Sequence, residues 1–431
     1  RELESHGWRE IDLVAVNLYP FQAAASDPCA SEEDAVEQID IGGVALLRAG
    51  AKAFADVTVV CDPGDYALVL DQIEVHGGTL PETRRRLAAK AFARTAAYDG
   101  AIRGYLSGGD DLLPGRLWLD LHKWADLRYG ENPHQRAALY TQADGAAVEA
   151  GPGPLGGQLL QGRPLSYNNL LDLDAAWRAA VAFERPTVVI VKHLSPCGIA
   201  SADTLAHAWP SALAGDPLSA FGSVVAVNRP FDGTAARALG DLFVEGIAAP
   251  GFSAEALQVL SGEEAGGRRG CRLLQMAPNV EDALELRSVR GGMLMQERDD
   301  GDRADWRTVT DREPSAEEMT ALRFAWRAVA HVKSNAILLA RGRAAVGIGG
   351  GLPSRVDAVR LAVSKAGAGA AGAVMASDAF FPFPDAVEVA AEAGVSAVVQ
   401  PGGSLRDEQV IEAADRLGLA MCFTGVRHFR H

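Results

Sequence analysis

Short apolar runs alternate with longer amphipathic stretches along almost the whole chain. Apolar runs with the length of buried strands, bounded by Gly, Pro or polar residues, lie at residues 11–16, 57–61, 187–191, 373–376 and 395–399. Stretches with helical spacing lie at residues 44–54, 81–106, 165–181 and 316–331. Strands and helices that alternate in this way predict an α/β fold.

The segment 187–200, TVVIVKHLSPCGIA, combines a predicted strand with reactive side chains. The strand leads to Lys192 and His193, and the following Ser-Pro-Cys-Gly predicts a turn. Ligands gather at the carboxyl ends of strands in open α/β sheets, so the two residues form a candidate proton-handling pair. The alternative is that Lys192 is a solvated surface charge and His193 a polar residue that closes the strand.

Length and composition limit the class of protein. A chain of 431 residues predicts about two to three domains, and residues 107–115, rich in Gly, Pro and Asp, mark the expected boundary between 1–115 and 116–431. The net charge of −15 argues against a nucleic-acid or anionic-membrane partner. No apolar run reaches the ~18 residues of a transmembrane helix. Five scattered cysteines without a CxxC pair indicate a reducing, cytoplasmic environment.

Three motifs suggest other chemistries, and each lacks a required part. The glycine-rich run 347–351 could cradle an anion, but it has neither the lysine of a P-loop nor the spacing of a dinucleotide fingerprint. His193 and Cys197 are spaced as in half of a zinc deaminase site, yet Ser195 stands where that site needs Glu. With no CxxC either, we expect no zinc and no other metal ligand set. Ser195 also lacks the flanking glycines of a hydrolase nucleophile elbow.

Eight longer motifs resemble one family. LRYGENPHQ, LSYNNLLDLDAAW, VIVKHLSPCGIA, DPLSAFG, FAWRAVAHVKSNAI, SDAFFPF, QPGGSLRDEQVIEAA and FTGVRHFRH are similar to AICAR transformylase. NLYPF, IDIGGVALLRAGAK and RTAAYDGAI resemble the end of IMP cyclohydrolase, the other half of the same bifunctional purine-biosynthesis family. The resemblance runs essentially from end to end, with every motif in order.

The resemblance implies an α/β architecture of two parts. Residues 1–115 would be the C-terminal part of a methylglyoxal-synthase-like cyclohydrolase domain whose N-terminal segment is missing. Residues 116–431 would be a transformylase of two similar cytidine-deaminase-like α/β/α subdomains, about 116–300 and 301–431. The family also implies a cytoplasmic homodimer with sites at the dimer interface. A structural K⁺ near Ser334 and Asp378 is compatible with the resemblance.

In chemistry, the resemblance implies transfer of a formyl group from 10-formyltetrahydrofolate to the 5-amino group of AICAR, which gives FAICAR. His193 would be the proton acceptor, Lys192 would keep His193 neutral and assist the leaving group or the oxyanion, and Asn335 would orient the formyl oxygen. The AICAR-binding positions would be Arg128, Tyr129, Asn169, Phe221, Gly222 and Arg427. The folate-side positions would be Ser354, Arg355, Val356, Phe380, Pro382, Phe383 and Asp385.

The chain departs from the family pattern at a few places. Leu352 replaces an amide residue, and Ala386 falls where some members have Asn. The residues that match the retained part of the cyclohydrolase site are Asn17, Tyr19, Asp40, Gly42 and Lys52. The family's phosphate-binding loop would lie in the missing segment, so we expect ring closure to IMP to be weak or absent.

Two other functions compete with this expectation. A protein that includes the missing segment would be fully bifunctional and would also close FAICAR to IMP. A degenerate family member would bind a purine ribotide without catalysis. The presence of Lys192, His193 and Asn335 together argues against the second alternative.

Overall fold

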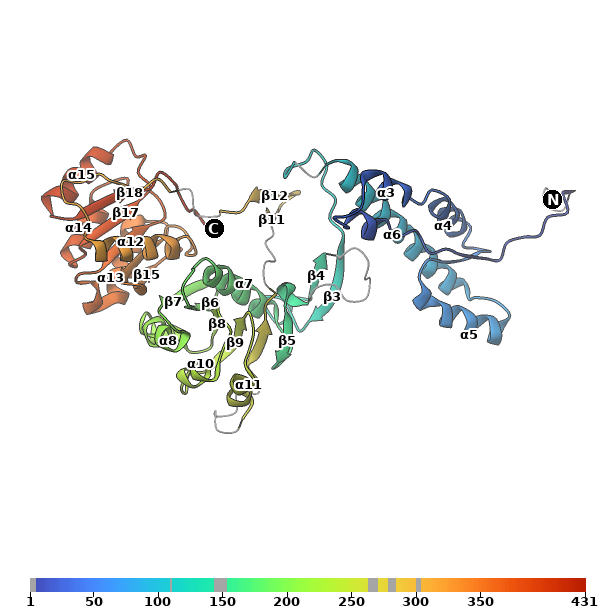
Figure 1. Ribbon diagram of the computed structural model, residues 1–431, viewed down its shortest axis with the longest axis horizontal. Coiled ribbons are helices and arrows are strands. Elements are labelled where there is room, and N and C mark those ends of the chain that lie inside the picture. Colours follow the sequence, from blue (N-terminus) through green and yellow to red (C-terminus); the bar gives the residue numbers. More distant parts are fainter. Residues whose placement is uncertain (1–4, 109–110, 143–152, 263–269, 278–283, 300–303) are drawn as a thin grey trace. The chain divides into compact units, whose positions relative to one another are not determined.

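The computed structural model describes residues 5–108, 111–142, 153–262, 270–277, 284–299 and 304–431. The chain divides into two compact units (Figure 1). The first consists of Arg1–His122, Thr141–Gly151 and Leu284–Glu297, and the second of Lys123–Tyr140, Pro152–Ala283 and Arg298–His431. Both units contain helices and strands, so the predicted α/β class is confirmed.

The first unit contains a short parallel sheet packed against helices. Its elements are β1 (Leu13–Ala15), α2 (Phe21–Ala25), α3 (Glu32–Glu37), α4 (Gly42–Lys52), β2 (Thr58–Val60), η1 (Pro63–Asp65), α5 (Tyr66–His76), α6 (Pro81–Leu106) and the antiparallel hairpin of β11 (Leu284–Val289) and β12 (Gly292–Glu297). Leu47, Val59 and Leu87 lie in its core. Helix α6 has the predicted bounds and begins at Pro81, where a missing N–H group costs no helical hydrogen bond.

The second unit is built on one mixed sheet. Within the described ranges this sheet has 12 strands, in the order β13-β18-β17-β16-β14-β15-β7-β6-β8-β9-β10-β5. Their bounds are β5 (Gln158–Gln161), β6 (Thr187–Lys192), β7 (Ser195–Ser201), β8 (Ser223–Val227), β9 (Val244–Ala249), β10 (Arg272–Gln275), β13 (Arg307–Thr308), β14 (Ile337–Arg341), β15 (Ala344–Gly349), β16 (Val374–Ser377), β17 (Ala397–Gln400) and β18 (Ala420–Phe423). A two-stranded ribbon of β3 (Leu121–Leu127) and β4 (Ala137–Gln142) precedes this sheet in the chain.

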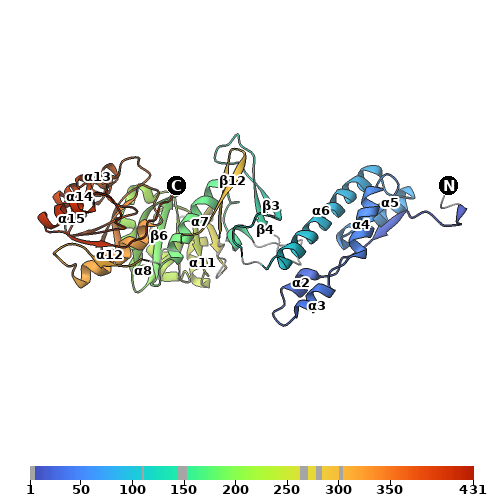
Figure 2. The same cartoon turned by 90° about the horizontal axis from the view of Figure 1, so that it is seen from above.

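Helices cover both faces of the large sheet (Figures 1 and 2). Helices α7 (Tyr167–Val181) and α12 (Ala316–Val329) pack on one face. The other face carries α8 (Leu205–Ala214), α10 (Gly233–Ala238), α11 (Ala254–Ser261), α13 (Arg355–Ala366), α14 (Asp385–Glu392) and α15 (Asp407–Arg416). Short helical turns are η2 (Pro154–Gly156), α9 (Pro217–Ala220) and η5 (Gly367–Ala370). Successive residues of β6 face opposite cores, as in any strand: Val189 the α7 side and Val188 the α8 side. None of the helices in the described ranges combines the length and apolar character needed to cross a bilayer.

The order of elements from α7 to β10 recurs from α12 to β18. Each half has a helix, an antiparallel hairpin and then three helix–strand units. The halves join where Ala200 of β7 pairs with Ala344 of β15, so a single sheet runs through both.

The predicted turn at Ser-Pro-Cys-Gly is wrong. These residues begin strand β7, which is antiparallel to β6, and the chain reverses at His193 and Leu194 instead. A register shift between Ile190 and Val191 accommodates Pro196 in the ladder, as bulges do. Gly198 permits close contact with α8, because a Cβ atom there would lie 2.1 Å from the carbonyl oxygen of Ala212. Tertiary pairing therefore overrides the local turn signal.

The glycine-rich run 347–351 also has a packing role. Gly347 and Gly349 lie in β15, and a Cβ atom on either would lie 2.1 Å from a backbone carbonyl oxygen of α13, those of Ala362 and Ala358 respectively. Helix α13 can approach the sheet this closely only because both residues are glycine.

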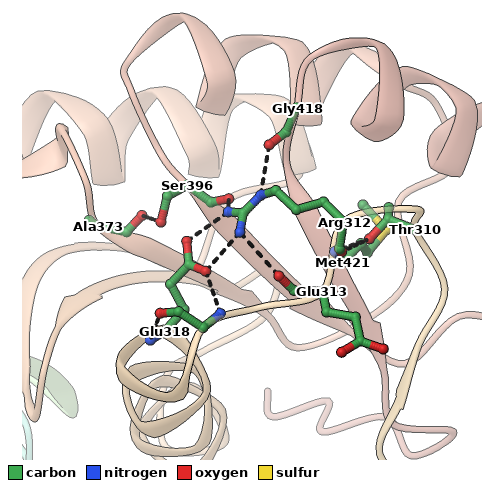
Figure 3. A network of polar contacts seen from close by, with 9 residues as sticks. Thr310, Arg312, Glu313, Glu318, Ala373, Ser396, Gly418 and Met421 are labelled. Carbon is green, nitrogen blue, oxygen red and sulfur yellow. Dashed lines mark hydrogen bonds and ion pairs between the residues drawn. The ribbon is translucent and has the colours of Figure 1, made fainter.

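A polar network fastens the start of α12 to the outer strands of the second half. Figure 3 shows the Arg312 guanidinium between the Glu318 carboxylate and several backbone carbonyl groups. Arg312 donates to both carboxylate oxygens of Glu318 at 2.7 and 2.9 Å, to Ser396 O at 2.6 Å and to Gly418 O at 2.9 Å. Glu318 also closes the capping box of α12 with Ser315.

Candidate active site

One edge of the large sheet collects most of the predicted site residues. The β6–β7 turn, with Lys192 and His193, lies at this edge. Strand β8 is antiparallel to β6, so the segment that precedes it, with Phe221 and Gly222, lies at the same edge.

The second half contributes to this edge as well. Strands β7 and β15 are antiparallel, which places the end of β15 beside the β6–β7 turn. Ile337 pairs with both Gly349 and Ser377. Asn335, the loop after β15 and the loop after β16 therefore meet at the edge that carries His193.

Lys192 and His193 differ in exposure and in contacts. The Lys192 side chain is partly buried, and its Nζ donates to the carbonyl oxygen of Phe221 at 2.7 Å. His193 is exposed and has φ of 52°, a left-handed backbone conformation. The backbone N–H groups of His193 and Leu194 donate to Oδ2 and Oδ1 of Asp172 at 3.2 and 2.6 Å. A solvent-exposed imidazole thus extends from a turn whose backbone is held by a carboxylate of α7.

Two exposed aromatic rings lie next to the Lys192 contact. The ring centroids of Phe221 and Phe243 are 5.5 Å apart, and the two side chains are 61% and 48% exposed. Gly222 has φ of 72° and donates its N–H to the Phe243 carbonyl at 2.8 Å. Exposed apolar rings beside an ammonium group suit a flat, polar heterocycle.

Asn335 has both ends of its side-chain amide occupied by protein groups. Its Nδ2 donates to the carbonyl oxygens of Leu352 and Pro353, each at 2.9 Å. Arg355 donates to Oδ1 at 2.6 Å, which fixes the orientation of the amide. Only the backbone carbonyl of Leu352 takes part, so the substitution of this residue relative to the family leaves the contact intact.

Arg355 itself is buried, although the resemblance assigned it to the folate side. Its guanidinium donates to Ser377 Oγ at 2.8 Å and to Asp378 Oδ1 at 2.5 Å. Asp378 is fully buried, and Ser334 Oγ donates to its other oxygen at 2.5 Å. Through Arg355, this buried network holds the side-chain amide of Asn335 in place. Next to it, Ser354 caps α13 and the partly buried Val356 packs against the core.

The loop after β16 separates its aromatic residues into two kinds. Phe381 is fully buried in the core, whereas Phe380 and Phe383 are 36% and 46% exposed and Pro382 is exposed between them. The Arg406 guanidinium lies 4.3 Å from the centroid of the Phe383 ring. The exposed members are the ones predicted to contact folate. Asp385 is exposed at the start of α14, and Ala386 is buried.

The remaining predicted ribotide residues lie in two loops and at the start of a helix. The guanidinium carbon of Arg128 lies 5.4 Å from the centroid of the Tyr129 ring. Arg128 also lines a hollow of about 260 Å³ together with His134 and Arg136. Asn169 is in the capping box of α7, where its Oδ1 accepts a hydrogen bond from Ser166. Arg427 is exposed, and its guanidinium carbon lies 4.3 Å from the centroid of the Phe429 ring.

The predicted cyclohydrolase residues all lie in the first unit; they are Asn17, Tyr19, Asp40, Gly42 and Lys52. Tyr19 and Lys52 are exposed. Asn17 donates to the Tyr66 hydroxyl at 3.3 Å, and Asp40 Oδ1 accepts from the Gly43 N–H at 2.6 Å. The second contact holds the start of α4.

Within the described ranges, no group of His, Cys, Asp and Glu side chains has the arrangement of a metal site. Cys197 Sγ lies 3.5 Å from the Ile190 carbonyl oxygen, and burial raises the pKa of this thiol to about 12. A raised pKa disfavours the thiolate that binds metals.

Sequence reasoning missed three residues of this edge: Asp172, Phe243 and Arg406. Asp172 lies in the quoted motif LSYNNLLDLDAAW, but nothing local distinguishes it from Asp174, which forms an ion pair with Arg178. Phe243 lies at this edge because β9 begins there, and Arg406, within the motif QPGGSLRDEQVIEAA, because β17 ends there.

The fold and this edge define an enzyme-like α/β protein with a basic, histidine-bearing turn next to exposed aromatic loops. A model of the family described as AICARFT/IMPCHase bienzyme matches residues 50–365. The chain is 48% identical to the bifunctional purine biosynthesis protein PurH of Halalkalibacterium halodurans, over all of this chain and 83% of the relative. It is also 48% identical to PurH of Myxococcus xanthus, over all of this chain and 84% of that protein. The chain belongs to the AICARFT/IMPCHase family.

Among solved structures, a crystal structure of ForH is 38% identical and covers 25% of this chain and 56% of that chain. Its TM-score of 0.21 is too low for a comparison of folds.

Proposed function

We propose that the protein transfers a formyl group from 10-formyltetrahydrofolate to the 5-amino group of AICAR and releases FAICAR and tetrahydrofolate. The observation that carries this proposal is the position of Lys192, His193 and Asn335 at one edge of the sheet, in a chain of the AICARFT/IMPCHase family. Its relatives are named as purine biosynthesis proteins.

The chemistry explains why a histidine is needed. The amine of AICAR is a weak nucleophile, because its lone pair is delocalised into the imidazole and the carboxamide. Its nitrogen attacks the formyl carbon, the bond from that carbon to folate N10 breaks, and N10 takes up a proton. His193 accepts the proton that the amine loses, and Lys192 assists the oxyanion or the departing nitrogen. Holding two reactants in line can contribute about 7–11 kcal/mol.

The proposal assigns binding residues to each of the two reactants. Arg128 and Arg427 supply guanidinium groups suited to the ribotide phosphate, and Tyr129, Asn169, Phe221 and Gly222 complete the ribotide side. The exposed Phe380, Pro382 and Phe383 suit the flat pterin ring of the folate. Asn335 would contact the formyl oxygen on exchanging one of its present backbone partners.

Formation of tetrahydrofolate tests the proposal directly. We expect the absorbance change of tetrahydrofolate release when the protein is mixed with AICAR and 10-formyltetrahydrofolate, and none when AICAR is omitted. AICAR binding by calorimetry without any release of tetrahydrofolate would instead support a ribotide-binding protein.

A second activity is ring closure of FAICAR to IMP. The word bifunctional in the names of the relatives and the presence of Asn17, Tyr19, Asp40, Gly42 and Lys52 favour this second candidate. Chromatography of the reaction products separates the cases. FAICAR alone indicates formyl transfer only, whereas IMP that grows in step with tetrahydrofolate indicates both activities.

Two further features are proposals on the family resemblance. One is a homodimer, and the other is a structural K⁺ near Ser334 and Asp378, two residues that are in direct contact in this structure.

A further inference from the structure

The turn that carries His193 has a backbone conformation that its residue types rarely adopt. His193 and Leu194 form the two-residue connection between Lys192 and Ser195 and have φ of 52° and 63°. Two-residue hairpins with positive φ at both positions strongly prefer Asn-Gly or Gly-Gly. Residues with a larger side chain are strained in such conformations, so the surrounding structure must hold them there.

The corresponding hairpin of the second half shows the ordinary solution. There, the connection between β14 and β15 begins with Gly342, which has φ of 56°. No predicted site residue lies in that turn. Of these two hairpin turns, only the one that carries the proposed base has positive φ at residues other than glycine.

The carboxylate of Asp172 is the group that holds this turn. It comes from α7, which is anchored in the core through Leu170 and Leu173, and it lies 21 and 22 positions before the residues it contacts. One oxygen accepts the His193 N–H and the other the Leu194 N–H. The carboxylate therefore contacts both positive-φ residues at once.

The surroundings of Asp172 suit a carboxylate that accepts hydrogen bonds in a fixed position. Burial raises the pKa of its carboxyl group, while the two backbone N–H groups and the nearby His193 and Lys333 oppose that rise. A partly buried carboxylate is costly unless it is hydrogen-bonded, so its two N–H partners account for its presence.

We propose that Asp172 is a positioning residue for formyl transfer: it fixes the left-handed His193–Leu194 turn and so directs the His193 imidazole and the Lys192 ammonium towards the reactants. This inference rests on the proposed function. It gives Asp172 no contact with substrate and no proton to transfer.

Asp172→Asn tests the inference with little change of volume. Its amide oxygen can still accept one N–H, but its NH₂ group then faces the other. Displacement of a catalytic group by about 1 Å can lower the reaction rate by up to ~10²-fold. We therefore expect kcat to fall by roughly 10- to 100-fold with KM for AICAR changed less than about threefold. Asp174→Asn, on the same helix and outside the turn, is the matched control and should stay within about twofold of the wild type.

Rescue separates positioning from a general loss of stability. Leu194→Gly removes the strain at one positive-φ position, so adding it to Asp172→Asn should restore part of the lost kcat. Equal melting temperatures of Asp172→Asn and Asp174→Asn are expected. An Asp172→Asn enzyme with wild-type kcat, or a kcat loss that follows a fall in melting temperature without rescue, overturns the inference.

Hydrogen exchange gives a readout that does not depend on activity. The amides of His193 and Leu194 should exchange faster in Asp172→Asn than in Asp174→Asn, as measured by mass spectrometry of the peptide that spans residues 187–200. A wild-type protein without formyl transfer would reject the proposed function even if this exchange difference is seen. If the exchange rates of these amides do not change in Asp172→Asn, Asp172 does not fix the turn, even if formyl transfer is confirmed.

Discussion

At the scale of single residues, the candidate site combines an exposed histidine with a buried polar network. His193 is exposed, and Lys192 next to it is anchored on the Phe221 carbonyl. Asn335 depends on Arg355, which is buried together with Asp378. The His193 side chain therefore faces solvent, while the Arg355–Asp378 ion pair next to Asn335 is buried.

His193→Ala should remove most of the activity and leave the fold unchanged. General acid–base catalysis contributes about 10²–10⁴-fold, so we expect kcat for tetrahydrofolate release to fall by that factor. The side chain is exposed, so the melting temperature should not move. His207→Ala, an exposed histidine in the first turn of α8, is the control. A His193→Ala enzyme with most of its kcat would exclude this residue as the base.

Arg355→Ala should be much more destabilising than the loss of a surface arginine. It leaves the fully buried Asp378 without its guanidinium partner, which costs about 3–5 kcal/mol. Arg360→Ala breaks an exposed ion pair with Asp357 on the same helix and should cost less than about 1 kcal/mol. Urea unfolding of both variants measures the difference. Similar midpoints would contradict a structural role of the buried pair.

At the scale of elements, the Arg312–Glu318 network joins the first turn of α12 to the segments that flank β17 and β18. The hydrogen bonds from Arg312 lower the pKa of Glu318 to about 2, from an ordinary value of 4.5. The folded state thus favours the charged carboxylate. The stabilisation is complete above pH ~4.5 and is lost as the pH falls through about 2.

Glu318→Gln should therefore be destabilising near neutral pH and nearly silent in strong acid. Hydrogen bonds to charged groups contribute about 1.5–3 kcal/mol, which sets the expected difference from the wild type at pH 7. This difference should shrink between pH 4.5 and pH 2. Chemical unfolding at several pH values measures it, with the exposed Glu317→Gln as control. A difference that is constant with pH would show that the charge of Glu318 does not contribute.

At the scale of the whole molecule, exposed apolar side chains on the β11–β12 hairpin support the proposed homodimer. Leu286, Val289, Met293 and Leu294 are between 43% and 60% exposed. Scattered exposed apolar residues are common, but four on one small hairpin are a candidate for burial by a second chain.

Sedimentation tests the assembly. We expect the mass of a dimer for the wild type, and Leu294→Glu should weaken association if the hairpin is part of the interface, because a carboxylate resists desolvation. Lys123→Glu, an exposed change of charge elsewhere, is the control. An active monomer would reject the homodimer.

The sequence by itself determined the elements whose signals are local. Helix α6 follows its proline start and periodicity, and strand β6 its run of β-branched residues. The motifs also nominated Lys192, His193, Asn335 and the aromatic loop as site residues, because each lies within a short stretch of consecutive residues that can be recognised without the fold. In SDAFFPF, Phe380 and Phe383 are exposed and Phe381 is buried, and the folate-side role of the exposed pair stays a prediction.

Only the tertiary structure decided which residues meet. Strand β7 contains Pro196 and Gly198, so local propensity predicts a turn, and only pairing with β6 makes it a strand. The edge that joins His193 to Asn335 depends on the antiparallel pairing of β7 with β15, about 140 residues apart along the chain. Asp172 and Arg355 acquire their positioning contacts in the same way. Hydrogen bonds of this kind depend on distance in space, and a linear pattern of hydrophobic and polar residues does not record that distance.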